Sequence, residues 1–344
     1  MSLGPKSRII VAGAGSVGCY LGGCLAAAGR DVTLLLRPRL LEVIAPSGLQ
    51  IRDLNGKTRS VPPSALAVVA DASTALKSAD LILVTVKCRS TAEMGKFIAA
   101  HAPESVVVVS LQNGVANLRV LADVLGPARR LLGGMVPFNV VQRVEGEAVP
   151  NFRRGSRGTI RIATGFAGLR DLLDVEGAPV AEISNIEAVL WGKLLINLNN
   201  ALNALSDLPL AAELADRQWR ILLSNQMREG LAALKAAGVK PGRVEGVTPM
   251  LIPLVLRLPD WLFKLLAGRT LAVLSEARSS MWEDLEAGRP TEIDYIQGEI
   301  VKTAAKVGLS APVTERVMQL IKQAERARRG SPGLPPMAVA SGVL

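Results

Sequence analysis

The sequence predicts an α/β domain with a doubly wound parallel sheet, followed by an all-α domain. Three observations carry this prediction. A glycine-rich turn near the start of the chain joins a short apolar run to a helix of small residues. Nearly continuous aliphatic and β-branched runs at 79–87 and 104–114 are typical of parallel strands buried on both faces. After residue 184 the pattern changes to long segments with helical periodicity.

The first domain is expected to span residues 1–183 and to alternate strands with helices. Its strands begin with "RIIVA" before the glycines and continue with "RDVTLLLR", ahead of the two buried runs. Helical segments separate these strands, which is the βαβ alternation of a doubly wound sheet. In such a sheet, ligands bind beyond the carboxyl ends of the strands.

The second domain, residues 184–327, is expected to be helical, and residues 328–344 to form a flexible tail. Prolines and charged residues interrupt its apolar tract 247–268, which leaves no run near the ~20 apolar residues that a membrane span requires. We interpret this tract as buried or partly mobile helices. The expected helical segments are 185–207, 217–238, 271–288 and 291–308.

The composition narrows the classes of function. A formal net charge of +10 suits nucleic acids, anionic membranes or small anions. The few aromatic residues do not interleave with the basic ones, so we expect no nucleic-acid partner. Three cysteines without C-x-x-C spacing and no signal peptide predict a cytoplasmic protein. His101 is the single histidine, so we expect neither a histidine-based triad nor a metal site.

The motif G-x-G-x-x-G is typical of dinucleotide binding by a Rossmann-type domain. Its glycines allow a tight turn, close approach of the backbone to a pyrophosphate, and packing of the helix on the strand. The motif lies between a strand and a helix, and another strand follows that helix, which favours a cofactor site over a plain turn. The cofactor-binding candidates here are Gly13, Ala14, Gly15, Ser16, Val17 and Gly18.

Arginines stand at the tip of the second strand, where NAD-binding domains carry an acid. An acid there would bond the 2′-hydroxyl of NAD and repel a 2′-phosphate, whereas Arg37 offers a planar fork of donors to that phosphate. The sequence therefore predicts NADPH or NADP+ as the cofactor. Arg39, two residues farther on, either assists or faces solvent.

Two polar residues follow the two buried runs. Lys87 ends "LILVTVK" and Asn113 ends "VVVVSLQN", on the rim where this fold binds ligands. A single Lys or Asn after a strand is ordinary loop chemistry. Two of them at matching ends of neighbouring strands favour a role at the ligand site.

The segment "WGKLLINLNNALNAL" provides a candidate proton donor. Lys193 and Asn197 are four residues apart and share one helical face. The surroundings are apolar, and desolvation lowers the pKa of an ammonium group. Such a lysine can protonate the alkoxide that hydride addition to a carbonyl leaves. The alternative is an exposed cation on an amphipathic helix.

Ser280 and Glu292 lie in "ARSSMWEDLEAGRPTEIDYIQGE". Thr291 with Asp294 resembles a capping box, which places Glu292 in the first turn of a helix, where the dipole favours its charge. From this pattern Glu292 is either a surface acid that complements the dipole or a functional carboxylate.

Taken in order, "GAGSVG", "LLLR", "VK", "LQNGV", "WGKLLIN", "ARSSM" and "TEIDYIQGEI" resemble the 2-dehydropantoate 2-reductase (ketopantoate reductase) family over nearly the whole chain. The resemblance implies NADPH-dependent reduction of 2-dehydropantoate to (R)-pantoate, a step toward pantothenate and coenzyme A. It also implies a Rossmann-type domain followed by a helical domain of the 6-phosphogluconate dehydrogenase C-terminal type.

The resemblance further implies roles for single residues. Lys193 would be the general acid, and Glu292 would contact the substrate hydroxyl and help to place the lysine. Asn197 would hydrogen-bond the substrate, and Ser280 would contact the substrate carboxylate. Asn113 would lie where the nicotinamide ribose and the substrate meet, and Lys87 would border the cofactor.

The chain departs from the family at two places, one of which is the apolar tract 247–268, longer than in compact members. Where well-studied members carry a second Asn eight residues after the lysine, this chain has Ala201, and Asn200 and Asn203 are the candidates to replace it. The missing asparagine motivates one alternative, an NADPH-dependent reductase of another small 2-oxo acid. A separate alternative of another class is a non-catalytic NADP-binding module, in which the second domain serves a partner. The sequence is compatible with a homodimer.

Overall fold

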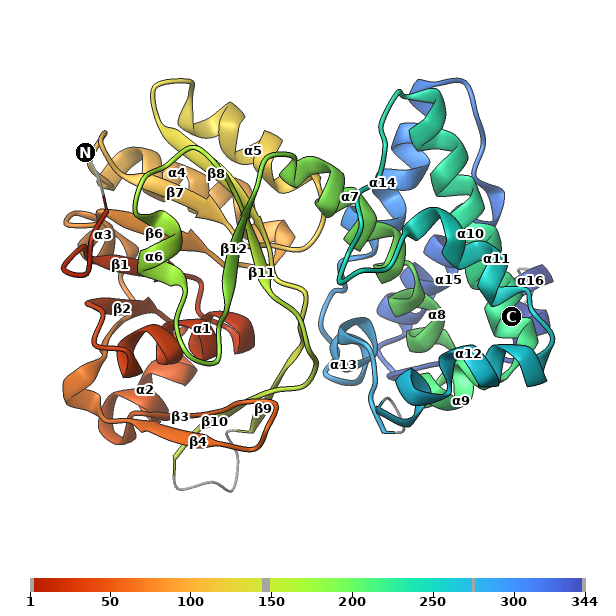
Figure 1. Ribbon diagram of the computed structural model, residues 1–344, viewed down its shortest axis with the longest axis horizontal. Coiled ribbons are helices and arrows are strands. Elements are labelled where there is room, and N and C mark those ends of the chain that lie inside the picture. Colours follow the sequence, from red (N-terminus) through yellow and green to blue (C-terminus); the bar gives the residue numbers. More distant parts are fainter. Residues whose placement is uncertain (1–2, 144–148, 274–275, 342–344) are drawn as a thin grey trace. The chain divides into compact units, whose positions relative to one another are not determined.

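A computed structural model of the protein describes residues 3–143, 149–273 and 276–341. The chain divides into two compact units, Met1–Glu187 and Ala188–Leu344, which Figure 1 shows. This division falls inside a helix, whereas the sequence predicts a boundary after residue 183.

The first unit contains an eight-stranded sheet in the order β12-β11-β8-β7-β6-β1-β2-β5. The strands from β8 to β5 are parallel, β11 is antiparallel to β8, and β12 is parallel to β11. This topology confirms the predicted doubly wound sheet. The strands are Ile9–Ala12 (β1), Val32–Leu35 (β2), Ala67–Val69 (β5), Leu81–Val84 (β6), Val107–Ser110 (β7), Arg130–Met135 (β8), Ile160–Ala163 (β11) and Val180–Ile183 (β12).

Helices cover both faces of this sheet (Figure 1). Successive side chains of a strand point to opposite faces, so the continuous apolar runs supply two cores. Ile9 and Val11 of β1 belong to the core that includes α1 and α6, while Ile10 and Ala12 belong to the core with α3, α4 and α5. The helices are Ser16–Ala27 (α1), Pro38–Ser47 (α2), Ala72–Leu76 (α3), Thr91–His101 (α4), Ala116–Leu125 (α5) and Leu169–Leu173 (α6), with short 3-10 turns at Pro63–Ala65 (η1) and Cys88–Ser90 (η2).

A second, four-stranded sheet in the order β4-β3-β10-β9 packs on α1, and the sequence analysis does not anticipate it. Adjacent glycines of α1 face the two sheets. A Cβ on Gly22 would collide with Leu34 of β2, and a Cβ on Gly23 would lie 2.7 Å from Ile51 of β3. The small residues of α1 therefore let it pack closely between both sheets. The strands are Leu49–Arg52 (β3), Thr58–Val61 (β4), Val140–Arg143 (β9) and Asn151–Arg154 (β10).

The second unit is helical, which confirms the predicted all-α domain. Its helices are Ile186–Asn197 (α7), Asn199–Ser206 (α8), Leu210–Ala215 (α9), Arg217–Ala236 (α10), Ile252–Leu256 (α11), Asp260–Val273 (α12), Ser280–Glu286 (α13), Ile293–Lys306 (α14), Pro312–Ala327 (α15) and Pro336–Ser341 (α16), with a 3-10 turn at Pro249–Leu251 (η3). The long helix α10 contacts α8, α9, α11, α14, α15 and α16. Residues 274 and 275 of the expected helical segment 271–288 lie outside the described residues.

The expected helical segment 185–207 is two helices, because the chain breaks between α7 and α8 at Leu198. Gln297 Nε2, from α14, donates a hydrogen bond to the Leu198 carbonyl oxygen at 2.9 Å. Gln297 is fully buried. The break is therefore held by a polar side chain of a distant helix.

The apolar tract 247–268 forms η3, α11 and the first part of α12. One side of it is buried, including Pro253, Leu256 and Phe263. The other side presents exposed apolar side chains: Val247, Met250, Leu251, Leu254, Trp261, Leu265 and Leu266. None of the described helices is long and apolar enough to span a bilayer.

Arg220 of α10 holds this tract in place. Its guanidinium is completely buried, bonds Asp260 at 2.6 Å and lies 4.3 Å from the centre of the Phe263 ring. It also donates to backbone carbonyls at the ends of α9 and α11, those of Leu214, Ala215, Leu256 and Leu258. Carbonyls at the end of a helix have no intrahelical partner, so one buried arginine satisfies both ends.

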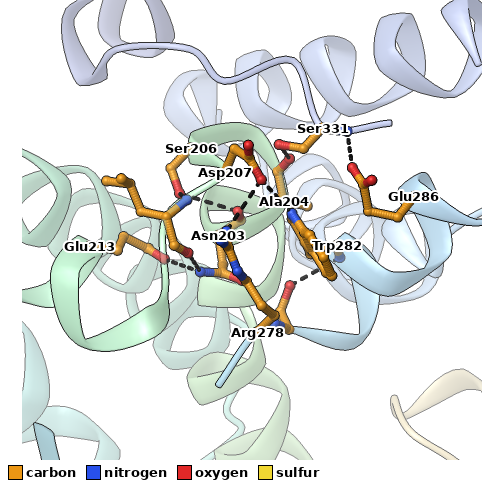
Figure 2. Close-up of polar contacts among 11 residues, drawn as sticks. Asn203, Ala204, Ser206, Asp207, Glu213, Arg278, Trp282, Glu286 and Ser331 are labelled. Carbon is orange, nitrogen blue, oxygen red and sulfur yellow. Dashed lines mark hydrogen bonds and ion pairs between the residues drawn. The ribbon is translucent and has the colours of Figure 1, made fainter. Parts of the chain in front are cut away.

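Part of the segment 328–344, which the sequence predicts to be a flexible tail, bonds to α8 and forms the short helix α16. Ser331 Oγ donates to the Ala204 carbonyl at 2.8 Å (Figure 2). The backbone N–H of Leu334 donates to the Leu205 carbonyl at 2.8 Å. These bonds satisfy carbonyls in the last turn of α8, and α16 follows. The last three residues lie outside those described.

We predict that Arg220→Met lowers the free energy of unfolding by about 3 kcal/mol or more, because it leaves several buried carbonyls without donors. Urea unfolding followed by circular dichroism measures this change. The control is Arg217→Met on the same helix, whose exposed side chain donates to the Arg257 carbonyl at 3.3 Å. The control should lose about 0.5 kcal/mol or less, and equal losses in both variants would contradict the role of Arg220.

Candidate functional site

The glycine-rich turn is fixed at the carboxyl edge of the parallel sheet. The backbone N–H of Thr85, after β6, donates to the Ala12 carbonyl at 2.9 Å, and that of Ala14 donates to the Leu35 carbonyl of β2 at 2.9 Å. Gly13 has φ +82°, and a Cβ there would collide with Val86. The turn thus requires glycine for its backbone angle and for its contact with the loop after β6.

The N-terminus of α1 is open to an anion. Gly15 is the N-cap residue, no described side chain caps the helix, and the first turn carries no acid. A Cβ on Gly15 would have nothing within 4 Å, whereas one on Gly18 would lie 2.6 Å from Thr85 Oγ1. Ser16 Oγ lies 3.1 Å from Gln142 Oε1 of the second sheet. The first-turn amides of α1 are therefore available to a phosphate group.

Arg37 lies two residues beyond β2, as the N-cap residue of α2. Both Arg37 and Arg39 are exposed, and the first turn of α2 carries no acid. A cation at a helix N-terminus opposes the helix dipole, so these arginines add no stability there through the dipole. An anionic group would be favoured at this place by the guanidinium groups and by the dipole.

Lys87 and Asn113 each lie three residues beyond a strand, after β6 and β7. Val84 and Ser110, the last residues of those strands, are partners in the sheet. The two loops therefore leave the sheet side by side, as the sequence analysis expects, and both side chains are exposed at this edge.

A buried polar network, which the sequence analysis missed, joins these two loops. Gln112 Nε2 donates to the Val86 carbonyl at 3.0 Å and to Thr91 Oγ1 at 2.7 Å. Thr91 Oγ1 donates to Asn117 Oδ1 at 2.8 Å, and Asn117 Nδ2 donates to the Asn113 carbonyl at 2.5 Å. Polar residues in "LQNGVAN", directly after a buried strand, were the available signal. The network fixes the backbone that carries Asn113.

Lys193 lies on α7 among apolar residues, with a half-buried side chain. Burial lowers the pKa of Lys193, and the negative charge of Glu245 opposes that shift. The direction agrees with the expectation for a desolvated ammonium group. Asn197, one turn later on the same face, is 8% exposed. Glu245 is not among the site residues predicted from the sequence.

Ser280 is the first residue of α13, and the preceding Ser279 ties that helix to α8. Ser279 N donates to Asn203 Oδ1 at 2.8 Å, and Ser279 Oγ donates to the Asn200 carbonyl at 2.8 Å. Asn203 is fully buried and its amide nitrogen bonds Glu213 Oε2 at 2.7 Å, as Figure 2 shows. Asn203 is therefore occupied by structural contacts, which leaves Asn200 as the candidate to replace the missing asparagine.

Glu292 is the N-cap residue of α14, one position before the first turn in which the sequence analysis expects it. Thr291 Oγ1 accepts from Ile293 N at 3.2 Å, but the expected capping box does not form, because Thr291 N donates to Glu325 Oε1 at 2.6 Å and the Asp294 carboxylate pairs with Lys322. The Glu292 side chain is only 6% exposed. A nearly buried carboxylate is not the surface acid of the alternative reading.

Glu213 is another buried acid, and it is not among the residues predicted from the sequence. It lies on α9 and is fully buried. Burial raises the pKa of Glu213 to about 8, although the hydrogen bond from Asn203 opposes the shift. No group of three metal-ligating side chains lies together in the described part of the chain.

Known proteins resemble both parts of the chain. Residues 9–163 match the family described as "Ketopantoate reductase PanE/ApbA", and residues 185–325 match its C-terminal counterpart. A 2-dehydropantoate 2-reductase from Pyrococcus abyssi is 31% identical over 330 residues, which cover 92% of this chain and 98% of the relative.

Solved structures share the fold. A PanE/ApbA family ketopantoate reductase from Ralstonia eutropha JMP134 is 28% identical, with a TM-score of 0.78 over 94% of this chain and 99% of that chain. A D-mandelate dehydrogenase, solved with NADH and anilino(oxo)acetate, is 20% identical, with a TM-score of 0.76 over 93% of this chain and 99% of that chain. The second likeness shows the fold alone.

We predict that Glu213→Gln flattens the pH dependence of stability. The folded-state pKa of Glu213 is raised from the ordinary 4.5 to about 8. The stability that this acid contributes is therefore complete below the unfolded-state pKa and is lost as pH rises toward the folded-state pKa. The amide variant avoids this loss, so it should gain more stability at about pH 8.5 than at about pH 5, by up to a few kcal/mol.

Urea unfolding at the two pH values measures the difference. The control is Glu104→Gln at an exposed position, which should change the free energy of unfolding equally at both pH values. A variant at position 213 that gains no more at the higher pH than at the lower would refute the prediction.

Proposed function

We propose that this chain, which belongs to the ketopantoate reductase family, uses NADPH to reduce 2-dehydropantoate to (R)-pantoate. Members of the family are oxidoreductases acting on CH–OH groups. The product is a precursor of pantothenate and coenzyme A. The observation that carries the proposal is Lys193. It lies in the part of the chain that matches the family's C-terminal region, and burial lowers its pKa.

The α/β unit fits a dinucleotide cofactor. The uncapped N-terminus of α1 and the open space at Gly15 suit a pyrophosphate. Arg37, at the N-terminus of α2, suits a 2′-phosphate and thus NADPH over NADH. Lys87 and Asn113 would border the cofactor at the same sheet edge. When bound, the reduced nicotinamide supplies the hydride that adds to the substrate carbonyl carbon.

The helical unit supplies the proton. Lys193 Nζ donates a proton to the oxygen of the substrate carbonyl, which becomes the new hydroxyl group, and the lysine is left neutral. A lowered pKa makes this ammonium a stronger acid than an exposed one, and its half-buried position limits competing water. The lysine then regains a proton from solvent before the next turnover.

Polar groups at the starts of two helices and on α7 would hold the substrate. Asn197 would bond the substrate, Ser280 would contact its carboxylate, and Glu292 would accept a hydrogen bond from its hydroxyl group. The ties among Ser279, Asn203 and α8 support this role for Ser280, because they fix the start of α13.

A second candidate function is the reduction of another small 2-oxo acid. Ala201 stands where well-studied family members carry an asparagine, and it is completely buried. A pocket without that amide makes one hydrogen bond fewer to the substrate, which changes which 2-oxo acid is preferred.

We predict that the purified protein oxidises NADPH with 2-dehydropantoate and that Lys193→Ala lowers turnover by roughly 10²–10⁴-fold, the usual contribution of a positioned acid. Absorbance at the NADPH band follows the reaction, beside a panel of other 2-oxo acids. Lys235→Ala, an exposed lysine of α10, is the matched control and should keep full turnover. Undiminished turnover without Lys193 would refute its role, and no turnover with any 2-oxo acid would favour a binding module.

We predict that Arg37→Ala raises the KM for NADPH by about 10-fold or more, because a charge-assisted bidentate contact to the 2′-phosphate is lost. The KM for NADH should hardly change, since NADH lacks that phosphate. Steady-state kinetics with both cofactors measures the ratio, and Arg39→Ala run in parallel shows whether the second arginine assists. An equal loss with NADPH and NADH would argue against a phosphate contact.

A further inference from the structure

The loop between α10 and η3 packs its backbone directly on the turn of α7 that precedes Lys193. Gly242 N donates to the Ala188 carbonyl at 2.6 Å. A Cβ on Gly192 would collide with the Gly242 carbonyl and would lie 3.1 Å from Val244 Cγ2. Glycine at 192 therefore allows an approach that any larger residue would prevent.

This loop ends in a tight turn that holds Glu245 in an unfavourable backbone conformation. Val244 and Val247 exchange both backbone hydrogen bonds, at 3.1 and 2.9 Å. The two residues between them have positive φ, +48° for Glu245 and +80° for Gly246, which is the pattern of a type I′ turn. Such turns favour Asn, Asp or Gly at the first central position. A glutamate there is therefore strained.

Glu245 is the acid whose charge acts on Lys193. Two helices approach α7: Gly230 of α10 lies close to Leu195, and Gln297 of α14 bonds the Leu198 carbonyl directly after α7. The loop before η3 also carries Lys240 and Arg243. On α10, the carboxylate of Glu229 accepts hydrogen bonds from Val313 N and Thr314 N. On α14, Glu292 lies at the start of the helix, Asp294 pairs with Lys322, and Glu299 pairs with Lys302.

We propose that Glu245 is a positioning residue for Lys193: the strained turn holds its carboxylate near the ammonium group, so that Lys193 stays protonated and oriented until the proton is transferred. The inference rests on the proposed function, in which Lys193 is the proton donor. It explains why a glutamate stands where the backbone favours asparagine, because asparagine would relieve the turn but lack the charge.

The expected effect on pH dependence has a definite sign. Burial disfavours the charged lysine and lowers its pKa, and Glu245 favours the charged form. Removing the carboxylate lowers the pKa of Lys193 further, so the lysine loses its proton at a lower pH. Reduction requires the protonated lysine, and the alkaline limb of the kcat profile should therefore move to lower pH.

The test compares Glu245→Asn with Glu245→Asp and with Arg328→Asn. Arg328 is another residue with positive φ, +52°, at the exposed end of α15. Asparagine should raise Tm at both positions because it tolerates this conformation. Only the change at 245 should shift the alkaline limb of kcat to lower pH. Glu245→Asp suits the turn and keeps the charge, so it should restore the limb toward its original pH.

A second measurement needs no turnover. The rate at which an acylating reagent modifies Lys193, measured by mass spectrometry against pH, reports the neutral amine directly. Glu245→Asn should move this profile to lower pH. If it moves and no 2-oxo acid is reduced, the coupling stands and the proposed function fails. If both profiles stay in place in Glu245→Asn, or if Arg328→Asn shifts them equally, the inference is overturned.

Discussion

Helix α1 packs between two sheets, and the organisation of the first unit depends on how closely it approaches both. Gly22 and Gly23 remove the side chains that would separate the helix from β2 and β3. The apolar surface of α1 can therefore be buried on two sides, although the helix contains few large residues. The same arrangement brings β9 to the start of α1, where Gln142 meets Ser16. The end of the helix proposed to bind the cofactor pyrophosphate is thus bounded by the second sheet as well as by the parallel one.

In the helical unit, the ends of several helices leave backbone carbonyls without intrahelical partners inside an aliphatic core. Arg220 donates to carbonyls at the ends of α9 and α11, and Gln297 donates to the Leu198 carbonyl after α7. Asn203 of α8 bonds the Leu208 carbonyl before α9 and the backbone N–H of Ser279 at the start of α13. Each of these polar side chains is buried and bonded to backbone. Lys193 differs from them, since its partly buried charge lies on the face proposed to act on substrate.

Local patterns predicted the parallel sheet, the glycine turn and the helical character of the second unit, because each depends on neighbours in the sequence. The second sheet escaped prediction since Thr58–Val61 and Asn151–Arg154 are short and largely polar, without the run of apolar residues that marks the other strands. The break at Leu198 escaped because apolar residues continue across it. Partners far apart in sequence, such as Glu325 for Thr291 or Glu245 for Lys193, leave no mark on local spacing.

The packing of the C-terminal segment has a practical consequence for how the gene is trimmed. A disorder-based choice would end the open reading frame after α15, at the start of a stretch rich in glycine and proline. That choice would delete Ser331 and Leu334, the donors to the last turn of α8. The helix that loses these donors also carries Asn200, whose carbonyl anchors Ser279 at the start of α13. Ending the recombinant chain after Ala327 would thus reach the candidate substrate site through one helix.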